Sequence, residues 1–244
     1  MEIQWFGHPT FKLQTDEGVI TYLDPFFEAN PVSPVKLSEI READLVAVTH
    51  GHDDHIGDAL GIIEQTGAHL IGTPEICHYA ETHGVTYNEE STAMNIGGSV
   101  TREGVTFHGT ISFHASALYG EEWEKDQQMI PNGSAMGYLI EIPEGPRIYY
   151  SGDTGLTKEM QLIGDIYRPD IAIIPIGGRY TMTPKLAARA ASFLGAEKVI
   201  PMHYNTFDFN RQSVGEYQKL VDDLTSGVEV IDLEPGDVYE PPGF

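Results

Sequence analysis

Three histidines and two aspartates are packed into one short stretch of the sequence. Residues 49–58 read THGHDDHIGD, so His50, His52 and His55 fall within six positions and Asp53 and Asp54 lie between them. Imidazole and carboxylate groups are the ligands that zinc and similar divalent ions take from proteins. The spacing differs from that of a helical H-E-x-x-H site, so we expect a glycine-rich metal-binding loop. A solvated polar loop is the alternative.

Four further acidic or histidine residues follow apolar runs. Asp24 ends VITYLD, His114 ends TFHGTISFH, Asp153 follows RIYYSG and His203 follows KVIPM. Any one of them would be read as a cap or as a hydrogen-bonded residue at a strand end. Sites in α/β sheets form at the carboxyl ends of strands, so together with the histidine-rich stretch they predict one convergent site.

The elements that must position these residues alternate between strands and helices. Apolar runs rich in Val, Ile, Tyr and Phe predict strands at residues 19–23, 45–48, 69–71, 105–113, 138–142, 147–150, 171–176, 199–202 and 228–231. Periodicity predicts helices at residues 58–65, 74–82, 158–167, 184–194 and 214–224. Both halves run from strands to strand–helix units, which predicts a layered α/β fold with a duplicated plan.

Composition narrows the function. The chain has 244 residues with 14 Lys and Arg against 37 Asp and Glu, a formal net charge of −23. Such a charge argues against nucleic acid and anionic membrane as partners. We expect a small-molecule substrate. One cysteine, Cys77, excludes an internal disulfide. No signal peptide is visible and no apolar stretch approaches the length of a membrane span, so by default we expect a cytoplasmic protein. No linker divides the chain, and we expect a single domain over residues 1–244. The oligomeric state, including a homo-oligomer, stays open.

Residues 50–55, HGHDDH, match the H-x-H-x-D-H motif of the metallo-β-lactamase superfamily, and His114, Asp153 and His203 follow in the order which that superfamily uses. The segments GHPTFKL, LDPF, MNIGG, FHAS, SGDTG, PIGG and PMHYNTF extend the likeness over nearly the whole chain. The sequence thus resembles the UPF0173 group of metal-dependent hydrolases, relatives of L-ascorbate-6-phosphate lactonase.

The resemblance implies a four-layer αββα sandwich with two metal ions between the sheets. It assigns His50, His52 and His114 to the first metal, Asp54, His55 and His203 to the second, and Asp153 to both. Asp24 would be a buried carboxylate that orients ligands, and Asp53 would not be a ligand. Zinc is the default metal for such ligands, and manganese, iron or nickel would also fit.

The expected reaction is hydrolysis of a lactone or another small ester by hydroxide that the two metals hold. A phosphodiesterase, and a non-catalytic metal-binding or regulatory protein on the same scaffold, are the alternatives. Tyr204 and Asn205, next to His203, are candidate catalytic residues that would stabilise the oxyanion or protonate the leaving group. Ordinary hydrogen bonding at a strand end would equally explain both.

Three further features bear on the site. His8, in WFGHPT, would lie at the site mouth as a neighbour of the ligands or a substrate contact, or would be a packed histidine. Arg179, in a loop between a strand and a helix, would bind an anionic group of the substrate, or would pair with a surface acid. Residues 115–135 lack periodicity and would form either a lid over the site or a surface insertion.

Overall fold

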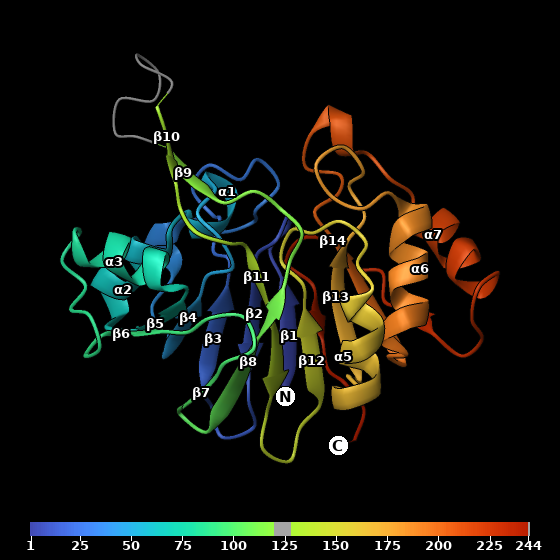
Figure 1. The fold of residues 1–244 in the computed structure, drawn as a ribbon, viewed down its shortest axis with the longest axis horizontal. Helices are drawn as coiled ribbons and strands as arrows, with labels where there is room; N and C mark the ends of the chain where they lie inside the picture. The colour runs from blue at the N-terminus through green and yellow to red at the C-terminus, as the bar shows by residue number, and fades with distance from the viewer. Residues whose placement is uncertain (120–127, 244) are drawn as a thin grey trace.

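The computed structural model describes residues 1–119 and 128–243, which form two large sheets with helices on their outer faces (Figure 1). The first sheet has seven strands, in the spatial order β16 (Val238–Tyr239), β1 (Glu2–Trp5), β2 (Phe11–Gln14), β3 (Ile20–Leu23), β4 (Leu45–Ala47), β5 (His69–Gly72) and β6 (Ser91–Ala93). The second sheet also has seven, in the order β15 (Glu229–Val230), β14 (Lys198–Met202), β13 (Ile171–Pro175), β12 (Arg147–Tyr150), β11 (Met136–Glu141), β8 (Val105–Ile111) and β7 (Ser99–Arg102).

Each sheet begins with antiparallel strands and continues with parallel ones. Strands β1 to β3 pair antiparallel and β3 to β6 parallel. In the second sheet β7, β8, β11 and β12 pair antiparallel, and β12 to β15 pair parallel. The two sheets therefore repeat one plan, as the sequence predicts.

Helices connect the parallel strands and cover the outer faces, because a parallel pair needs a crossover. Helices α2 (Ala59–Thr66) and α3 (Pro74–Glu81) serve the first sheet, and α5 (Glu159–Tyr167), α6 (Pro184–Leu194) and α7 (Val214–Asp222) serve the second. The α6 helix has the predicted bounds: the Thr183 side chain accepts the Leu186 N–H at its start, and Gly195 ends it with φ 64°. The result is the layered α/β sandwich expected from the sequence.

All the strands and helices that the sequence predicts are present, with ends shifted by a few residues. The sequence misses several short strands, among them β1 and β7, because these four-residue segments are not continuous apolar runs. One expectation is wrong: Asp53–Ile56, expected in a loop, forms a single helical turn, α1. Two acids at its first turn favour that turn. Short 3₁₀ turns lie at η1 (Leu37–Glu39) and η2 (Asp208–Asn210).

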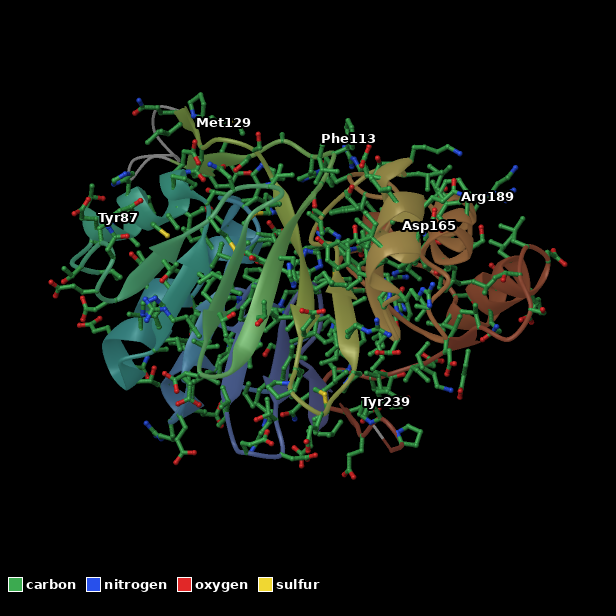
Figure 2. All side chains as sticks on the ribbon, turned by 60° about the horizontal axis from the view of Figure 1, so that its bottom comes forward. Tyr87, Phe113, Met129, Asp165, Arg189 and Tyr239 are labelled. Carbon is green, nitrogen blue, oxygen red and sulfur yellow. The ribbon has the colours of Figure 1, made fainter. Side chains whose placement is uncertain are left out.

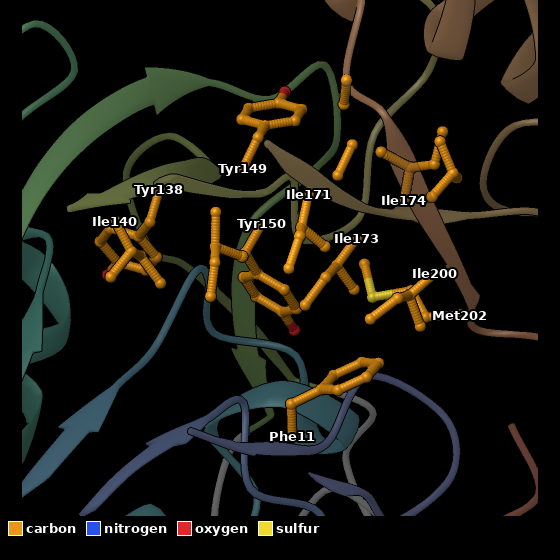
Figure 3. Close-up of a cluster of buried hydrophobic side chains, with 14 of the residues drawn as sticks. Phe11, Tyr138, Ile140, Tyr149, Tyr150, Ile171, Ile173, Ile174, Ile200 and Met202 are labelled. Carbon is orange, nitrogen blue, oxygen red and sulfur yellow. The ribbon is translucent and has the colours of Figure 1, made fainter. Parts of the chain in front are cut away.

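A core of aromatic and branched side chains joins the two sheets (Figure 3). The rings of Phe11 in β2 and Tyr150 in β12 meet edge-on, with centroids 6.2 Å apart. The Tyr138 hydroxyl, from β11, donates a hydrogen bond to the carbonyl of Val48 beyond β4 at 2.6 Å. Tyrosines thus fill the space between the sheets and also tie the strand ends together.

Two strands from opposite ends of the chain pair in the first sheet, since β1 near the N-terminus lies beside β16 near the C-terminus. This pairing is what a single domain would give, and the one-domain organisation stays a prediction. In the ranges that the structure describes, no helix has the length and apolar character that a bilayer crossing requires.

The hydrogen bond between Tyr138 and Val48 predicts a measurable stability difference. Tyr138→Phe should lower the free energy of unfolding by about 1 kcal/mol, because a buried carbonyl loses its donor. Tyr217→Phe is the matched control: its hydroxyl is buried and has no hydrogen-bond partner in the described part of the chain. Urea titrations compare the two variants, and an equal loss in both would contradict the assigned role of Tyr138.

Candidate metal centre

The predicted site residues come together where strands of both sheets end. Asp24 follows β3, His50 comes shortly after β4, and His114, Asp153 and His203 come after β8, β12 and β14. The β9–β10 ribbon and the loop after β14 rise at this same edge (Figure 1). Figure 2 shows Phe113 and Met129 there as well. The sequence expectation of one convergent site therefore agrees with the positions of the strand ends.

Nitrogen and oxygen atoms of eight side chains approach one another closely enough to share metal ions. Three groups each bring their ligand atoms within 4.8 Å of one another: His50, His52 and His114; His50, His55 and Asp153; and His8, Asp54 and His203. All seven predicted ligands are among them. His8 is the addition, and it takes the position beside Asp54 and His203 that the resemblance gives to His55.

Asp24 is fully buried and accepts hydrogen bonds from several residues that surround the site. One of its oxygens accepts hydrogen bonds from the Thr49 hydroxyl, His55 Nδ1 and the Tyr150 hydroxyl, each at 2.7 Å. The other oxygen accepts the Thr49 backbone N–H at 2.7 Å. One carboxylate therefore joins β3, the metal-binding motif and the second sheet.

These contacts fix which ring nitrogens carry hydrogen. A carboxylate only accepts, so His55 Nδ1 carries a proton and donates it to Asp24. The Thr49 hydroxyl gives its hydrogen to Asp24, so it accepts one from His50 Nδ1 at 3.0 Å. His50 therefore presents an Nε2 lone pair to the cluster, the form in which imidazole binds metal. Burial acts against charge on His55, but Asp153, Asp24 and Asp54 outweigh it and raise the pKa of His55 well above its usual value, so a metal ion at its Nε2 would have to displace a proton.

Asp54 lies between two histidines of different segments. Its Oδ2 is 3.0 Å from His8 Nε2 and 3.5 Å from His203 Nε2. His8 Nδ1 lies 2.9 Å from the Thr206 hydroxyl, and the His8 and His203 rings are 3.8 Å apart between centroids. Burial lowers the pKa of His8 to about 4, so this ring is neutral at pH 7 and donates its Nε2–H to Asp54.

The histidines of the cluster differ in the direction in which their pKa values are shifted. Burial lowers the pKa of His50, His52 and His114, which stay neutral at pH 7. Burial also acts against charge on His203, but Asp153 and Asp54 outweigh it and raise the pKa of His203 to about 9. Burial would raise the pKa of Asp153, yet His203 and His55 hold it well below its usual range. The Asp153 carboxylate is thus ionised at neutral pH, as a metal ligand must be.

Several buried atoms of the cluster face one another without forming hydrogen bonds. His55 Nε2 and Asp153 Oδ1 are 3.4 Å apart, and His203 Nε2 is 3.1 Å from Asp153 Oδ2. Within the described residues, His55 Nε2, Asp153 Oδ1 and His203 Nε2 have no hydrogen-bond partner. Ion pairs of His55 and His203 with Asp153 compensate their charges but leave these atoms without a hydrogen bond, which is costly for buried polar atoms. The donor set and its geometry fit divalent metal ions.

The backbone is strained where it carries the site. His8, Asp24 and His203 have φ values of 56°, 42° and 58°, in the left-handed region that side chains other than glycine rarely adopt. Gly177 allows one of these turns, because a Cβ there would lie 2.1 Å from the His203 carbonyl oxygen. Such strain persists only where surrounding contacts enforce it, and it is concentrated at functional sites.

The structure does not bring Tyr204 and Asn205 into contact with the cluster. The Tyr204 ring stacks on Trp5 with centroids 5.3 Å apart, and the Asn205 Oδ1 accepts the Gln212 backbone N–H at 2.8 Å. These contacts favour the structural explanation for both, and a catalytic role stays a prediction. Asp53 is exposed.

Residues 115–135 contribute a two-stranded ribbon of β9 (Ala117–Tyr119) and β10 (Met129–Pro131). Its base is tied to the motif, since the Gly51 N–H donates to Ser116 Oγ at 3.3 Å. The Tyr119 ring lies parallel to that of His52, with centroids 6.3 Å apart. The ribbon therefore flanks the cluster. Residues 120–127, with Trp123, lie outside the described residues, so a lid function stays a prediction.

Sequence reasoning missed three residues that support the site, namely Thr49, Tyr150 and Thr206. Thr49 and Tyr150 lie next to or near predicted ligands, directly at strand ends, which is the one signal that pointed to them. Their hydroxyls bind Asp24, and that of Thr206 lies beside His8.

The chain is similar to known proteins over nearly its full length. The model of the Beta-lactamase superfamily domain matches residues 21–204. The UPF0173 metal-dependent hydrolase of Methanopyrus kandleri is 42% identical over 240 residues, covering 98% of this chain and 100% of that protein. A UPF0173 metal-dependent hydrolase of Methanosphaera stadtmanae is 43% identical over 98% of this chain and 99% of its own.

Among solved structures, a metallo hydrolase from Ignicoccus hospitalis superposes with a TM-score of 0.82 at 35% identity, over 98% of both chains. The isothiocyanate hydrolase from Delia radicum gut bacteria superposes with a TM-score of 0.75 at 17% identity, over 100% of both chains, which shows a shared fold alone. The chain belongs to the beta-lactamase superfamily and, within it, to the UPF0173 metal-dependent hydrolases. It is an enzyme with the metallo-β-lactamase fold, as the sequence resemblance implies.

The position of Asp24 generates a test of the site's support. Asp24→Asn should weaken metal retention about 10- to 100-fold, because an amide cannot accept all the donors that orient Thr49 and His55. Competition with a chelator measures retention, and circular dichroism checks that the variant folds. Tyr150→Phe removes only one donor to the same carboxylate and should lose much less. Wild-type retention in Asp24→Asn would refute the orienting role.

Proposed function

We propose that this hydrolase cleaves a lactone or another small ester with two divalent metal ions, zinc being the default. In this proposal each ion has three ligands of its own and the two ions share a seventh. The ligands are His50, His52 and His114 for the first ion, Asp54, His55 and His203 for the second, and Asp153 for both.

The observation that carries this proposal is the convergence of buried ligand atoms that lack hydrogen-bond partners. His55 Nε2, Asp153 Oδ1 and His203 Nε2 are such atoms within the described residues, and Asp153 lies within 3.6 Å of both His114 and His203. A carboxylate between two histidine groups suits a ligand shared by two ions. The relatives are named metal-dependent hydrolases, which supports a metal site here but not a number of ions.

Two divalent ions would polarise a carbonyl oxygen and generate a nucleophile from water near neutral pH. The chain's own residues orient and hold this chemistry. Asp24 and Thr49 fix the rings of His50 and His55, so that their Nε2 atoms face the cluster. His8 holds Asp54 Oδ2 at 3.0 Å and keeps that carboxylate in one position. The preorganised geometry avoids reorganisation during the reaction.

A small ester fits the remaining features. The net charge of −23 disfavours polymeric nucleic acid, and the names of the relatives are those of hydrolases. The lactone is our first choice because the sequence resembles relatives of a lactonase. Cys77, the only cysteine, is buried, which fits a cytoplasmic enzyme that needs no disulfide.

The proposal predicts metal content and metal-dependent turnover. Protein purified without chelator should contain more than one equivalent of transition metal by elemental analysis, because two ligand groups share Asp153. A panel of lactones and small esters should be hydrolysed, with the activity lost on chelation and restored by added metal. A protein that holds two equivalents of metal and turns over none of the panel would refute ester hydrolysis as its reaction.

A pair of aspartate variants separates a ligand from its neighbourhood. Asp153→Ala should abolish hydrolysis and weaken metal retention, because it removes the ligand that both ions would share. Asp53→Ala is the matched control, since Asp53 belongs to the same motif but is exposed, and it should retain most of the activity. Kinetics and elemental analysis of both variants provide the readout. Wild-type activity in Asp153→Ala would rule out the two-metal arrangement.

A further inference from the structure

Three exposed aromatic rings lie together beside the candidate metal centre. Tyr180, Phe207 and Phe209 are 57%, 36% and 43% exposed. Phe207 and Phe209 stack with centroids 5.4 Å apart and planes 13° apart, and Tyr180 meets Phe209 edge-on at 5.5 Å. We call these three rings the aromatic shelf. Large exposed rings gathered at one place mark a binding surface more often than scattered ones do.

One end of the shelf touches the candidate ligands. The Phe207 ring meets the His8 ring edge-on, with centroids 5.4 Å apart. His8 in turn contacts Asp54 and packs on His203. A flat group that lies on the shelf would therefore have its near edge beside the metal-binding side chains.

The other end of the shelf carries a positive charge. The Arg179 guanidinium lies over the rings of Tyr180 and Phe209, at 5.1 Å and 5.5 Å from their centroids. No ion pair joins Arg179 to a carboxylate among the described residues, although the chain has many acids. Its N–H donors are available to an anion, and stacking on rings holds the planar group in place.

Two rings of the shelf, Phe207 and Phe209, lie on a hydrogen-bonded loop. The buried Asn210 side chain accepts the N–H groups of Thr206 and Phe207 at 3.1 Å and 2.8 Å, and donates to the His203 carbonyl at 3.3 Å. The loop is thus tied to the same residue that contributes a candidate ligand. This connection fixes the distance between the shelf and the site.

We propose that the shelf and Arg179 bind the substrate, and that the substrate class is an aromatic ester carrying an anionic group. The ring would pack against the exposed parts of Phe207 and Phe209, the ester would reach the metal centre, and a carboxylate or phosphate would bind Arg179. This inference rests on the proposed ester hydrolysis and adds the substrate class to it. Aromatic rings and the neighbouring guanidinium recognise this combination, which neither a purely aliphatic nor a neutral ester offers.

Three acetate esters test the inference: ethyl acetate, phenyl acetate and 4-acetoxybenzoate. In Phe209→Ala the ratio of kcat/KM for phenyl acetate to that for ethyl acetate should fall about tenfold. In Arg179→Ala the ratio for 4-acetoxybenzoate to phenyl acetate should fall about tenfold. Arg189→Ala, an exposed arginine on α6 (Figure 2), is the matched control and should change neither ratio. Unchanged ratios in both test variants would overturn the inference while ester hydrolysis stands.

Binding gives a second readout that does not need turnover. Calorimetry with 4-hydroxybenzoate and the zinc-loaded protein should detect binding that weakens about tenfold in Arg179→Ala and in Phe209→Ala, and not in Arg189→Ala. Absence of binding to the wild type, or equal binding to all variants, would overturn the inference. Binding that weakens as expected, in a protein that hydrolyses no ester, would support the shelf and refute the proposed reaction.

Discussion

The buried carboxylate of Asp24 is the constraint on which the site depends. It follows β3 in the first sheet, and it binds Thr49 and His55 of the metal-binding motif and Tyr150 of the second sheet. A fully buried carboxylate is tolerated only when hydrogen bonds satisfy it, and here four donors do so. Those donors come from both sheets. The hydrogen bonds that orient the ligands therefore also hold the two sheets together.

The shared hydrogen bonds of Asp24 explain why polar side chains lie at the strand ends. Strands of both sheets end at one edge, where His50, His114, Asp153 and His203 meet in space. The surrounding contacts hold the backbone of His8, Asp24 and His203 in its strained left-handed conformation. Loops beyond the ligands add the β9–β10 ribbon on one side and the aromatic shelf on the other. In the proposed function the scaffold therefore supplies the chemistry and the loops supply substrate recognition.

Most of the strands and helices and the candidate ligands could be predicted from the sequence, because apolar runs and ligand spacing are local signals. The α6 helix could be bounded from Thr183 and Gly195, and the strand ends identified the site residues. Tyr150 could not be assigned, since a tyrosine in an apolar run also suits a core and its partner Asp24 is 126 residues away. Tyr204 lies beside His203 in the sequence, but its ring packs on Trp5, a contact that residue order could not predict. The exposure of Phe207 and Phe209 could not be predicted either, because it depends on the conformation of their loop.

The central claim is that the ends of the two sheets hold two metal ions and that both ions bind Asp153. A crystal structure of the metal-loaded protein, with anomalous data collected at the absorption edge of the bound metal, tests it most directly. The account predicts two anomalous peaks in the cluster, one beside His50, His52 and His114 and one beside Asp54 and His203, with Asp153 contacting both. A single peak at full metal loading, or peaks away from these side chains, would contradict it.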